Sequence, residues 1–288
     1  MRARRALFDR LFYARLRALV GGRLDCLLSG AGALDTELSL FFRGLGLPVI
    51  EGYGLTETTA PLTGNLPGAI RSGSVGVPMP GTTVRISEQG EVLARGVGVF
   101  AGYRRASDNA DAFVDGFFRT GDLGSLDPDG RLRLKGRIKD VIVTAGGKTV
   151  TPAVWEGLVE GDPLVAHAVM VGEGKPYLGG LVLLDPESVA AWAEREGIAD
   201  LVGLRIPDDG SAVQIEDERL LGVVGKVVTA ANARLARSEQ VRRFVLLLAD
   251  LSESHGMVTP TMKLKRAVFT ESARHFVENL YTDARSRT

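Results

Sequence analysis

Apolar residues change their spacing twice along the chain, and each change predicts a different kind of structure. Up to about residue 50, short apolar runs such as Leu24–Leu28 alternate with helical patterns, which is typical of a parallel α/β sheet. From Ser72 to Leu134 the pattern has period two, and Asp127-Pro128-Asp129-Gly130 is a strong hairpin signal. We therefore predict a small β-barrel or meander over about residues 72–135, with strands at Thr83–Ile86, Gly90–Ala94 and Arg131–Leu134.

The spacing changes again after Gly136-Arg137-Ile138-Lys139-Asp140. We predict strands over Val165–Val171 and Tyr177–Leu184, followed by helices over Pro186–Glu196 and about Glu216–Arg237. The longer helix has one apolar stripe, formed by Leu220, Leu221, Val224, Val228, Ala231 and Leu235. This pattern predicts a compact α+β domain that follows a boundary near residue 138.

The first 24 residues have seven arginines, interleaved with Leu7, Leu11 and Leu19 at helical spacing. An arginine-rich, acid-poor amphipathic segment is typical of a targeting peptide or of a helix at a membrane interface. The alternative is a helix of a larger domain with its apolar face turned inward. No small-residue cleavage signal precedes Leu24–Leu28, which favours the helix of a larger domain.

Composition narrows the class of protein. The chain has 288 residues, 45% of them apolar and 24% charged, and its net charge is zero. Such a balance excludes strong binding to nucleic acid through a bulk field. Cys26 is the single cysteine, so an internal disulfide and a cysteine-based zinc site are excluded. No apolar run approaches the ~20 residues of a membrane span. We expect a cytoplasmic protein, and the basic N-terminal segment permits peripheral contact with a membrane.

Several common catalytic motifs are excluded by spacing. The stretch AGGKT (145–149) resembles the end of a phosphate-binding P-loop, but Ile142 stands where that motif requires glycine. The stretches SGAG (29–32) and SGSVG (72–76) lack the spacing of a GxSxG nucleophile elbow. The three histidines, His167, His255 and His275, are scattered along the chain, and we do not expect histidine catalysis.

Four other stretches hold the kinds of group that a nucleotide site uses. In chain order they are YGLTET (53–58), FRTGDLG (118–124), GRIKDVIVTAGGK (136–148) and TPTMKLKR (259–266). Tyr53 lies between two glycines and has an aromatic face for a base, while Thr56 has a hydroxyl for a phosphate oxygen. Glu57 is a hard carboxylate that suits Mg²⁺.

The later stretches add a ribose contact and a cation. Asp122 follows a Thr-Gly turn and could accept two hydrogen bonds from a ribose diol, and Lys263 could balance phosphate charge. Each residue also has a purely structural alternative. Tyr53 would be a core residue, Glu57 a helix-start carboxylate, Asp122 a turn former and Lys263 a solvated surface charge.

Taken in order, the four stretches resemble the adenylate-forming superfamily of acyl-CoA synthetases, acid-adenylating domains and luciferases. The forms TAGGK and TPTMKLKR are most similar to its long-chain fatty acyl-CoA ligases. The resemblance implies an α/β fold. Residues 1–138 would be a partial adenylation domain, formed by the end of a parallel α/β sheet and the β-barrel-like part. Residues 139–288 would be a mobile α+β domain, with a hinge near residues 137–140.

The resemblance also implies roles for single residues. The turn at Gly30, Ala31 and Gly32 would line the adenine pocket, with Tyr53 and the adjacent Gly54 against the base. In the catalytic set, Thr56 would contact the α-phosphate and Glu57 would hold Mg²⁺. These roles are implied by the family motif.

For the remaining stretches the same comparison implies four further roles. Asp122 and Arg137 would hold the ribose hydroxyls, and Lys139 matches the hinge position. Lys263 would bridge the acyl carboxylate and the α-phosphate as a catalytic residue. Gly146 and Gly147 would lie beside the pantetheine channel of coenzyme A. The implied substrates are a fatty acid, ATP and coenzyme A, with AMP as a product.

One expected element is missing from this sequence. These enzymes have a Ser/Thr/Gly-rich loop ending in Pro-Lys-Gly upstream of the tyrosine motif, and nothing like it occurs here. The first hypothesis is therefore a truncated long-chain fatty acid–CoA ligase, an AMP-forming acid–thiol ligase. The second is a non-catalytic remnant that binds nucleotide or coenzyme A, or a subunit that pairs with a separate N-terminal half. The third keeps the adenylation but passes the acyl group to a carrier protein.

Overall fold

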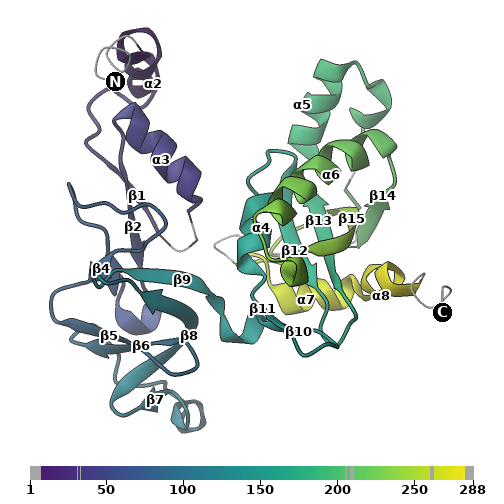
Figure 1. The fold of residues 1–288 in the computed structure, drawn as a ribbon. Helices are drawn as coiled ribbons and strands as arrows, with labels where there is room; N and C mark the ends of the chain where they lie inside the picture. The colour runs from purple at the N-terminus through teal and green to yellow at the C-terminus, as the bar shows by residue number, and fades with distance from the viewer. Residues whose placement is uncertain are drawn as a thin grey trace. The chain divides into compact units, whose positions relative to one another are not determined.

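The computed structural model describes residues 8–30, 32, 34–204, 206–207, 211–259 and 263–282. Ala31, one of the predicted adenine-pocket residues, lies outside this set. The chain divides into two compact units, Met1–Lys139 and Asp140–Thr288 (Figure 1). None of the described helices is long and apolar enough to cross a membrane.

The first sheet of the first unit begins with a parallel pair of strands. Strand β1 (Leu27–Ser29) pairs with β2 (Val49–Tyr53), and helix α3 (Thr36–Leu45) forms the crossover that a parallel pair requires. The Asp35 side chain caps α3 by accepting the Leu38 N–H at 2.9 Å. Strands β3 (Thr63–Gly64) and β4 (Val77–Pro78) then continue the sheet in antiparallel pairing. The predicted parallel sheet is thus present as one parallel pair with an antiparallel extension.

The N-terminal segment is helical, but its apolar face is not turned inward as expected. The π-helix η1 (Asp9–Tyr13) leads into α2 (Ala14–Leu19), and neither has a buried residue. Phe12 is 58% exposed and Leu19 is 82% exposed. Among the described residues, nothing covers this face. The helix is held instead by Arg17, which donates to the Leu45 carbonyl at the end of α3.

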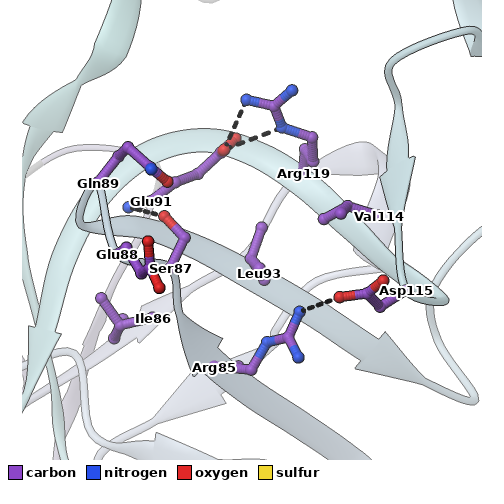
Figure 2. Close-up of a pocket in the computed structure, with 10 residues that line it drawn as sticks. All are labelled: Arg85, Ile86, Ser87, Glu88, Gln89, Glu91, Leu93, Val114, Asp115 and Arg119. Atoms are coloured by element: carbon purple, nitrogen blue, oxygen red, sulfur yellow. Dashed lines mark hydrogen bonds and ion pairs between the residues drawn. The ribbon is translucent and has the colours of Figure 1, made fainter.

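The second sheet of the first unit is antiparallel and curled. Its order is β5-β6-β8-β7, with β9 pairing to β8, and the strands are β5 (Thr82–Ile86), β6 (Glu91–Gly96), β7 (Phe113–Val114), β8 (Phe117–Leu126) and β9 (Leu132–Arg137). All three predicted strands are present. The predicted hairpin joins β8 to β9, with the Asp127 side chain accepting the Arg131 N–H at 2.9 Å. Arg85 and Asp115 form an ion pair on this sheet (Figure 2). The pairings among described residues leave β5 and β9 unjoined, so the sheet is an open half-barrel and not a closed barrel.

A small apolar cluster lies between the two sheets of the first unit. It contains Tyr53 and Leu62 beside the first sheet and residues of the second, namely Val84, Val92, Ala94 and Leu132. Single-turn 3-10 helices lie between strands of this unit at η2 (Thr56–Thr58) and η3 (Ala106–Asn109), and a third, η4 (Ile138–Asp140), follows β9 at the boundary of the unit. The tyrosine of the first motif is therefore part of the packing that joins the sheets.

The second unit is built on a sheet of order β12-β13-β15-β14. The strands are β12 (Val165–Val171), β13 (Leu178–Leu184), β14 (Ala212–Ile215) and β15 (Val241–Ala249), with a separate hairpin of β10 (Ile142–Val143) and β11 (Thr149–Val150). The helices are α4 (Ala153–Val159), α5 (Pro186–Glu196), α6 (Glu218–Ala233), α7 (Arg266–Ser272) and α8 (Arg274–Thr282), with short turns η5 (Ala199–Leu201) and η6 (Arg237–Glu239). The two predicted strands and the helix 186–196 are confirmed.

Helix α6 is shorter than the predicted span 216–237. It begins after Asp217, whose side chain accepts the N–H groups of Arg219 and Leu220. Near its end the Asn232 side chain exchanges hydrogen bonds with the backbone of Val241 on β15. This tertiary contact ties the last turn of the helix to the sheet, and the chain leaves the helix there.

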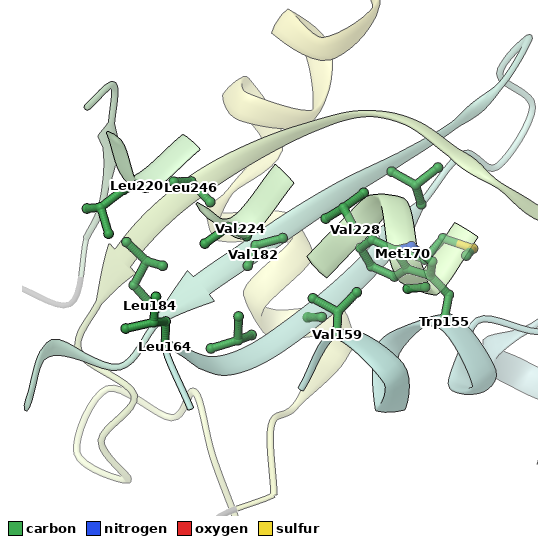
Figure 3. Close-up of a cluster of buried hydrophobic side chains, with 14 of the residues drawn as sticks. Trp155, Val159, Leu164, Met170, Val182, Leu184, Leu220, Val224, Val228 and Leu246 are labelled. Atoms are coloured by element: carbon green, nitrogen blue, oxygen red, sulfur yellow. The ribbon is translucent and has the colours of Figure 1, made fainter. Parts of the chain in front are cut away.

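Both faces of this sheet are covered, which explains why every residue of β13 is buried. Even-numbered side chains such as Val182 and Leu184 pack in one apolar cluster with α4 and α6, as Figure 3 shows. Odd-numbered side chains such as Leu181 and Leu183 pack in a second cluster with α7 and α8. The period of two thus distributes one strand between two cores.

The α6 stripe predicts a measurable contribution to stability. Leu220 is fully buried in the first of these clusters, so Leu220→Ala should lower the free energy of unfolding by about 2–5 kcal/mol. The two tryptophans, Trp155 and Trp192, both lie in this unit, so tryptophan fluorescence in denaturant follows its unfolding alone. Val268→Ala is the control, because Val268 is an exposed helical position in the same unit. This change should alter the free energy of unfolding by less than about 0.5 kcal/mol. Equal effects of the two changes would contradict the assignment of the core.

Candidate nucleotide-binding site

The carboxylate of Asp122 lies at the centre of the site. Asp122 on β8 is only 7% exposed, and both of its oxygens have donors. The Tyr53 hydroxyl donates to Oδ2 at 2.6 Å, and Arg137 Nε donates to Oδ1 at 2.8 Å. Asp122 and Arg137 are directly paired in the β8–β9 register, which places their side chains together. A buried carboxylate is tolerated when it is paired and hydrogen-bonded, and both conditions hold here.

Tyr53 is held in place by burial and by its hydrogen bond to Asp122. It is 9% exposed and belongs to the apolar cluster between the sheets. Burial, and then the charge of Asp122, raise the pKa of its phenol, so the hydroxyl stays a neutral donor to Asp122. The structural alternative of a core residue therefore applies to Tyr53. Its stacking on a base stays a prediction.

The glycine after Tyr53 is required by the chain itself. A Cβ at Gly54 would lie 2.9 Å from the Leu62 nitrogen and 3.0 Å from Ala60. Such a contact with backbone cannot be relieved by a side-chain rotation, so any larger residue would push the segment 60–62 away from β2. The close approach of this segment explains Gly54 without a ligand.

Glu57 is presented on the single turn η2 and is contacted by an aromatic residue. The Thr58 hydroxyl accepts the Leu55 N–H at 2.9 Å and fixes the turn. The Tyr103 hydroxyl donates to Glu57 Oε1 at 2.9 Å. The Tyr103 ring packs edge-on against the Phe100 ring, with the two ring centroids 4.8 Å apart. Sequence analysis did not select Tyr103. Its only signal was an isolated aromatic residue in the stretch AGYRR.

A cavity of about 420 Å³ brings several of the predicted residues together. The predicted site residues that line it are Glu57, Arg137 and Lys139, whereas Asp122 is not a lining residue. Gly121 and Tyr103 also line it, and Asp122 lies behind Arg137. Thr56 is exposed on the same turn as Glu57 but is not a lining residue. A larger hollow of about 540 Å³ around the β5–β6 hairpin contains no predicted site residue, so the smaller cavity is the candidate site.

Glu57 has the chemistry expected for a magnesium ligand. Mg²⁺ usually takes one or two carboxylates and completes its shell with water and substrate phosphates. The described residues hold no cluster of three or more metal-binding side chains, so a metal caged by protein alone is not built from them. Glu57 lines the cavity and is contacted there by the Tyr103 hydroxyl, so its carboxylate fits an ion that arrives with a nucleotide.

The predicted adenine turn follows the end of β1, next to the end of β2. A Cβ at Gly30 would lie 3.6 Å from the Gly52 carbonyl, and one at Gly32 would meet no atom within 4 Å. In parallel α/β sheets, ligands bind at the carboxyl ends of the strands. Glu51 on β2 is a buried carboxylate nearby, and burial raises its pKa while the Leu34 N–H lowers it in part. Sequence analysis did not select Glu51.

Gly146 and Gly147 lie in the tight turn between β10 and β11 of the second unit. The turn is closed by bonds from Thr144 N–H to the Lys148 carbonyl at 3.0 Å and from Gly147 N–H to the Thr144 carbonyl at 2.8 Å. A Cβ at either glycine would meet no atom within 4 Å. The outer side of the turn is therefore open.

Lys263 is paired with Thr259 beside an antiparallel bridge between Val258 and Leu264 in the second unit. The Thr259 N–H donates to the Lys263 carbonyl at 2.9 Å, and the Lys263 N–H donates to Thr259 Oγ1 at 3.1 Å. Three residues along, Arg266 pairs with the buried Glu156 of α4 and donates to the Met170 carbonyl. Burial raises the pKa of Glu156, and the Arg266 charge opposes that rise. The chain just after Lys263 is thus fixed to the core of its unit.

Comparison with protein families identifies the chain. Residues 5–104 match the model described as AMP-binding enzyme, and residues 139–203 match the model described as AMP-binding enzyme C-terminal domain. The chain belongs to the AMP-binding superfamily. The second match begins at Lys139, the last residue of the first compact unit.

Several curated relatives of this superfamily member are named long-chain fatty acid–CoA ligases. "Long-chain-fatty-acid--CoA ligase FadD15" of Mycobacterium tuberculosis is 41% identical over 282 residues, which cover 98% of this chain and 46% of that protein. "Long-chain-fatty-acid--CoA ligase ACSBG2" of Gallus gallus is 30% identical over 98% of this chain and 39% of that protein. The chain spans about half the length of the curated relatives it matches.

Solved structures of adenylation enzymes share the fold. An o-succinylbenzoate coenzyme A synthetase (MenE) of Bacillus subtilis, in complex with ATP and magnesium ion, gives a TM-score of 0.60 at 24% identity, over 84% of this chain and 45% of that one. The A-PCP didomain of a carboxylic acid reductase of Segniliparus rugosus, in complex with AMP, gives a TM-score of 0.69 at 20% identity. The match covers 97% of this chain and 39% of that one. At these identities the likeness shows the fold alone.

The Tyr53–Asp122 hydrogen bond predicts a stability effect that is independent of any ligand. Tyr53→Phe leaves one oxygen of a buried carboxylate without its donor, which should cost about 1.5–3 kcal/mol. Hydrogen exchange of the peptides that cover β2 and β8 measures this loss within the first unit. Tyr103→Phe removes an equivalent but exposed hydroxyl and should cost less than about 1 kcal/mol. A Tyr53→Phe variant as protected as the wild type would refute the contact.

Proposed function

We propose that this chain is part of a long-chain fatty acid–CoA ligase and that its first unit binds the adenosine and phosphate portions of ATP. The observation that carries the proposal is the constellation of Asp122 paired with Arg137 behind a cavity lined by Glu57. The motif matches and the named relatives support it. Because the chain spans about half of those relatives, the proposal concerns a ligase completed by further polypeptide.

In the proposed first half-reaction, a fatty acid carboxylate attacks the α-phosphorus of ATP, and the bond to the β-phosphate breaks to release pyrophosphate. Asp122 and Arg137 orient the ribose, and Thr56 contacts the α-phosphate. Lys263 lies between the two reacting anions and offsets their repulsion, so its contribution is electrostatic and positional. Bound Mg²⁺, held by Glu57, would neutralise phosphate charge.

In the proposed second half-reaction, the thiol of coenzyme A attacks the acyl carbon and AMP leaves with its electron pair, while the thiol proton passes to solvent. Gly146 and Gly147 would border the path of the pantetheine, because a turn without Cβ atoms lets a ligand approach the backbone closely. Lys139 would be the hinge about which the second unit moves between the half-reactions.

A second candidate is a nucleotide-binding subunit that pairs with a separate N-terminal half of the enzyme. The observation that favours it is the uncovered apolar surface of the first unit. Large apolar side chains on η1, α2, β1 and α3 are exposed, among them Phe12, Leu19, Leu28 and Phe41. Soluble monomers rarely expose contiguous apolar patches of this kind. Transfer of the acyl group to a carrier protein, instead of coenzyme A, is the third candidate.

The role of Lys263 predicts a split between the half-reactions. In the chain completed by an N-terminal half, Lys263→Ala should lower acyl-adenylate formation by at least about 100-fold, because one electrostatic stabiliser is lost. Thioester formation from supplied acyl-adenylate and coenzyme A should stay within about threefold of wild type. Lys265→Ala, a neighbouring exposed lysine, is the matched control. Equal loss of both half-reactions would sink the assigned role.

The absence of a phosphate loop from this sequence predicts weak activity of the chain on its own. We expect little ATP–pyrophosphate exchange with palmitate, because this sequence contains no Ser/Thr/Gly-rich loop ending in Pro-Lys-Gly to hold the β- and γ-phosphates. Co-expression with the N-terminal half of a homologous ligase should restore exchange. Substituting charged residues for Phe12 and Phe41 should block that restoration if the apolar surface is the contact. Robust exchange by the chain alone would show that no further half is needed.

A further inference from the structure

The strand that presents Asp122 contains an unusual irregularity. In the pairing of β6 with β8, Glu91 lies opposite Leu123 and Leu93 lies opposite Arg119. On β6 one residue, Val92, lies between Glu91 and Leu93. On β8 three residues, Thr120, Gly121 and Asp122, lie between the partners Arg119 and Leu123. The strand therefore bulges away from β6, and the regular ladder of hydrogen bonds is interrupted here.

Side chains replace the interrupted backbone bonds. Thr120 Oγ1 donates to the Val92 carbonyl at 2.7 Å and accepts the Asp122 N–H at 3.1 Å. Glu91 Oε1 accepts the Gly121 N–H at 3.1 Å. Gly121 has φ +71°, in the left-handed region that favours glycine. The bulge is thus held by the hydroxyl of Thr120 and the carboxylate of Glu91, which bind the N–H groups of Asp122 and Gly121.

Glu91 is otherwise unexplained by packing. It is 5% exposed, and a buried carboxylate is costly unless donors surround it. Its second oxygen accepts from Arg119 Nε at 2.9 Å (Figure 2), so one carboxylate joins the residue before the bulge to the middle of the bulge. Glu91 and Arg119 line both the hollow of the β5–β6 hairpin and the cavity of the candidate site.

We propose that Glu91 is a positioning residue for a ribonucleotide with free 2′- and 3′-hydroxyls. By holding the Gly121 N–H, Glu91 fixes the bulge so that Asp122 points between Tyr53 and Arg137. It acts through Asp122 and does not touch the ligand. The inference rests on the proposed function, because the ribose contact of Asp122 is the property that Glu91 would control.

The test compares the binding of AMP with that of 2′,3′-dideoxy-AMP to the full chain by calorimetry. The ratio of the dissociation constant for 2′,3′-dideoxy-AMP to that for AMP measures the preference for a ribose with free hydroxyls. This ratio isolates the ribose contact from general effects on the cavity. Glu91→Met keeps the volume but removes both acceptors, and it should lower the ratio by about tenfold, as loss of one charged hydrogen bond predicts. Glu91→Gln keeps an acceptor for Gly121 and should stay within about threefold of wild type. Glu88→Ala, an exposed glutamate in the same hairpin, is the control.

The outcomes separate this inference from the proposed function. A wild type that binds both nucleotides equally would overturn the ribose contact of Asp122, and the role of Glu91 with it. A wild type whose preference is lost in Asp122→Ala but kept in Glu91→Met would refute the positioning role alone. A variant with both Glu91→Met and Asp122→Ala should lose no more AMP preference than Asp122→Ala alone, because the two changes remove the same ribose contact.

A second variant covers the case in which Glu91→Met does not fold. Thr120→Val removes the other side-chain support of the same bulge and leaves Glu91 intact. It should also lower the AMP preference, whereas a preference equal to wild type would contradict control of Asp122 by the bulge. Circular dichroism of each variant establishes that a folded protein is being compared.

Discussion

The buried carboxylate of Asp122 is the interaction on which the first unit depends. It receives one donor from Tyr53 on β2 of the first sheet and one from Arg137 on β9 of the second sheet. The Tyr53 ring also packs in the apolar cluster between those sheets. One charge therefore fixes the distance between two sheets that share few apolar residues. Burial of this charge is tolerable only while both donors remain, so the packing of the unit and the geometry of the candidate site are the same constraint.

The second unit uses a similar device in a different place. Its two-sided sheet supplies a larger core, and Glu156 on α4 is buried at the edge of that core. Glu156 accepts from Arg266 and from the Met170 N–H, so it ties helix, sheet and the segment after Lys263 together. In both units a buried carboxylate with an arginine partner lies beside the segment proposed to act on the nucleotide. Segments that must present a charged side chain accurately are thereby joined to rigid elements.

Local sequence signals predicted the regular elements well where they agreed with the packing. Helix α5 has Asp185 as its N-cap and Gly197 as its left-handed terminator, and the predicted span 186–196 is correct. Predictions that depended on tertiary contacts were less accurate. Helix α6 ends where the Asn232 side chain bonds to Val241 on β15. In the described part of the chain, the curled sheet of the first unit stays open because β5 and β9, which are far apart in the sequence, do not pair.

The same distinction applies to the candidate site. The motifs and the family resemblance selected Asp122, Arg137 and Glu57, which do lie around or directly behind one cavity. Glu91 and Tyr103 were not selected, because each matters through a contact made across 28 or 46 residues. A bulge of three residues opposite one has no periodic signature in the sequence. Side chains that stabilise such irregularities become visible only when the register of the strands is known.

Binding and catalysis separate on physical grounds in this chain. The residues proposed to hold the ribose, Asp122 and Arg137, belong to one compact unit, and Asp122 is also held by Tyr53 and by the bulge. The proposed ribose contact therefore needs no group from further polypeptide. Adenylation requires more, because two anions must be brought together in one geometry and their repulsion offset. The exposed apolar side chains of α2, α3 and β1 lie in that same unit. Under the proposed function, the remaining half of the ligase would cover this surface. Nucleotide binding without exchange is therefore expected both of an incomplete ligase and of a non-catalytic nucleotide-binding remnant. Restoration of exchange by an N-terminal half distinguishes the two.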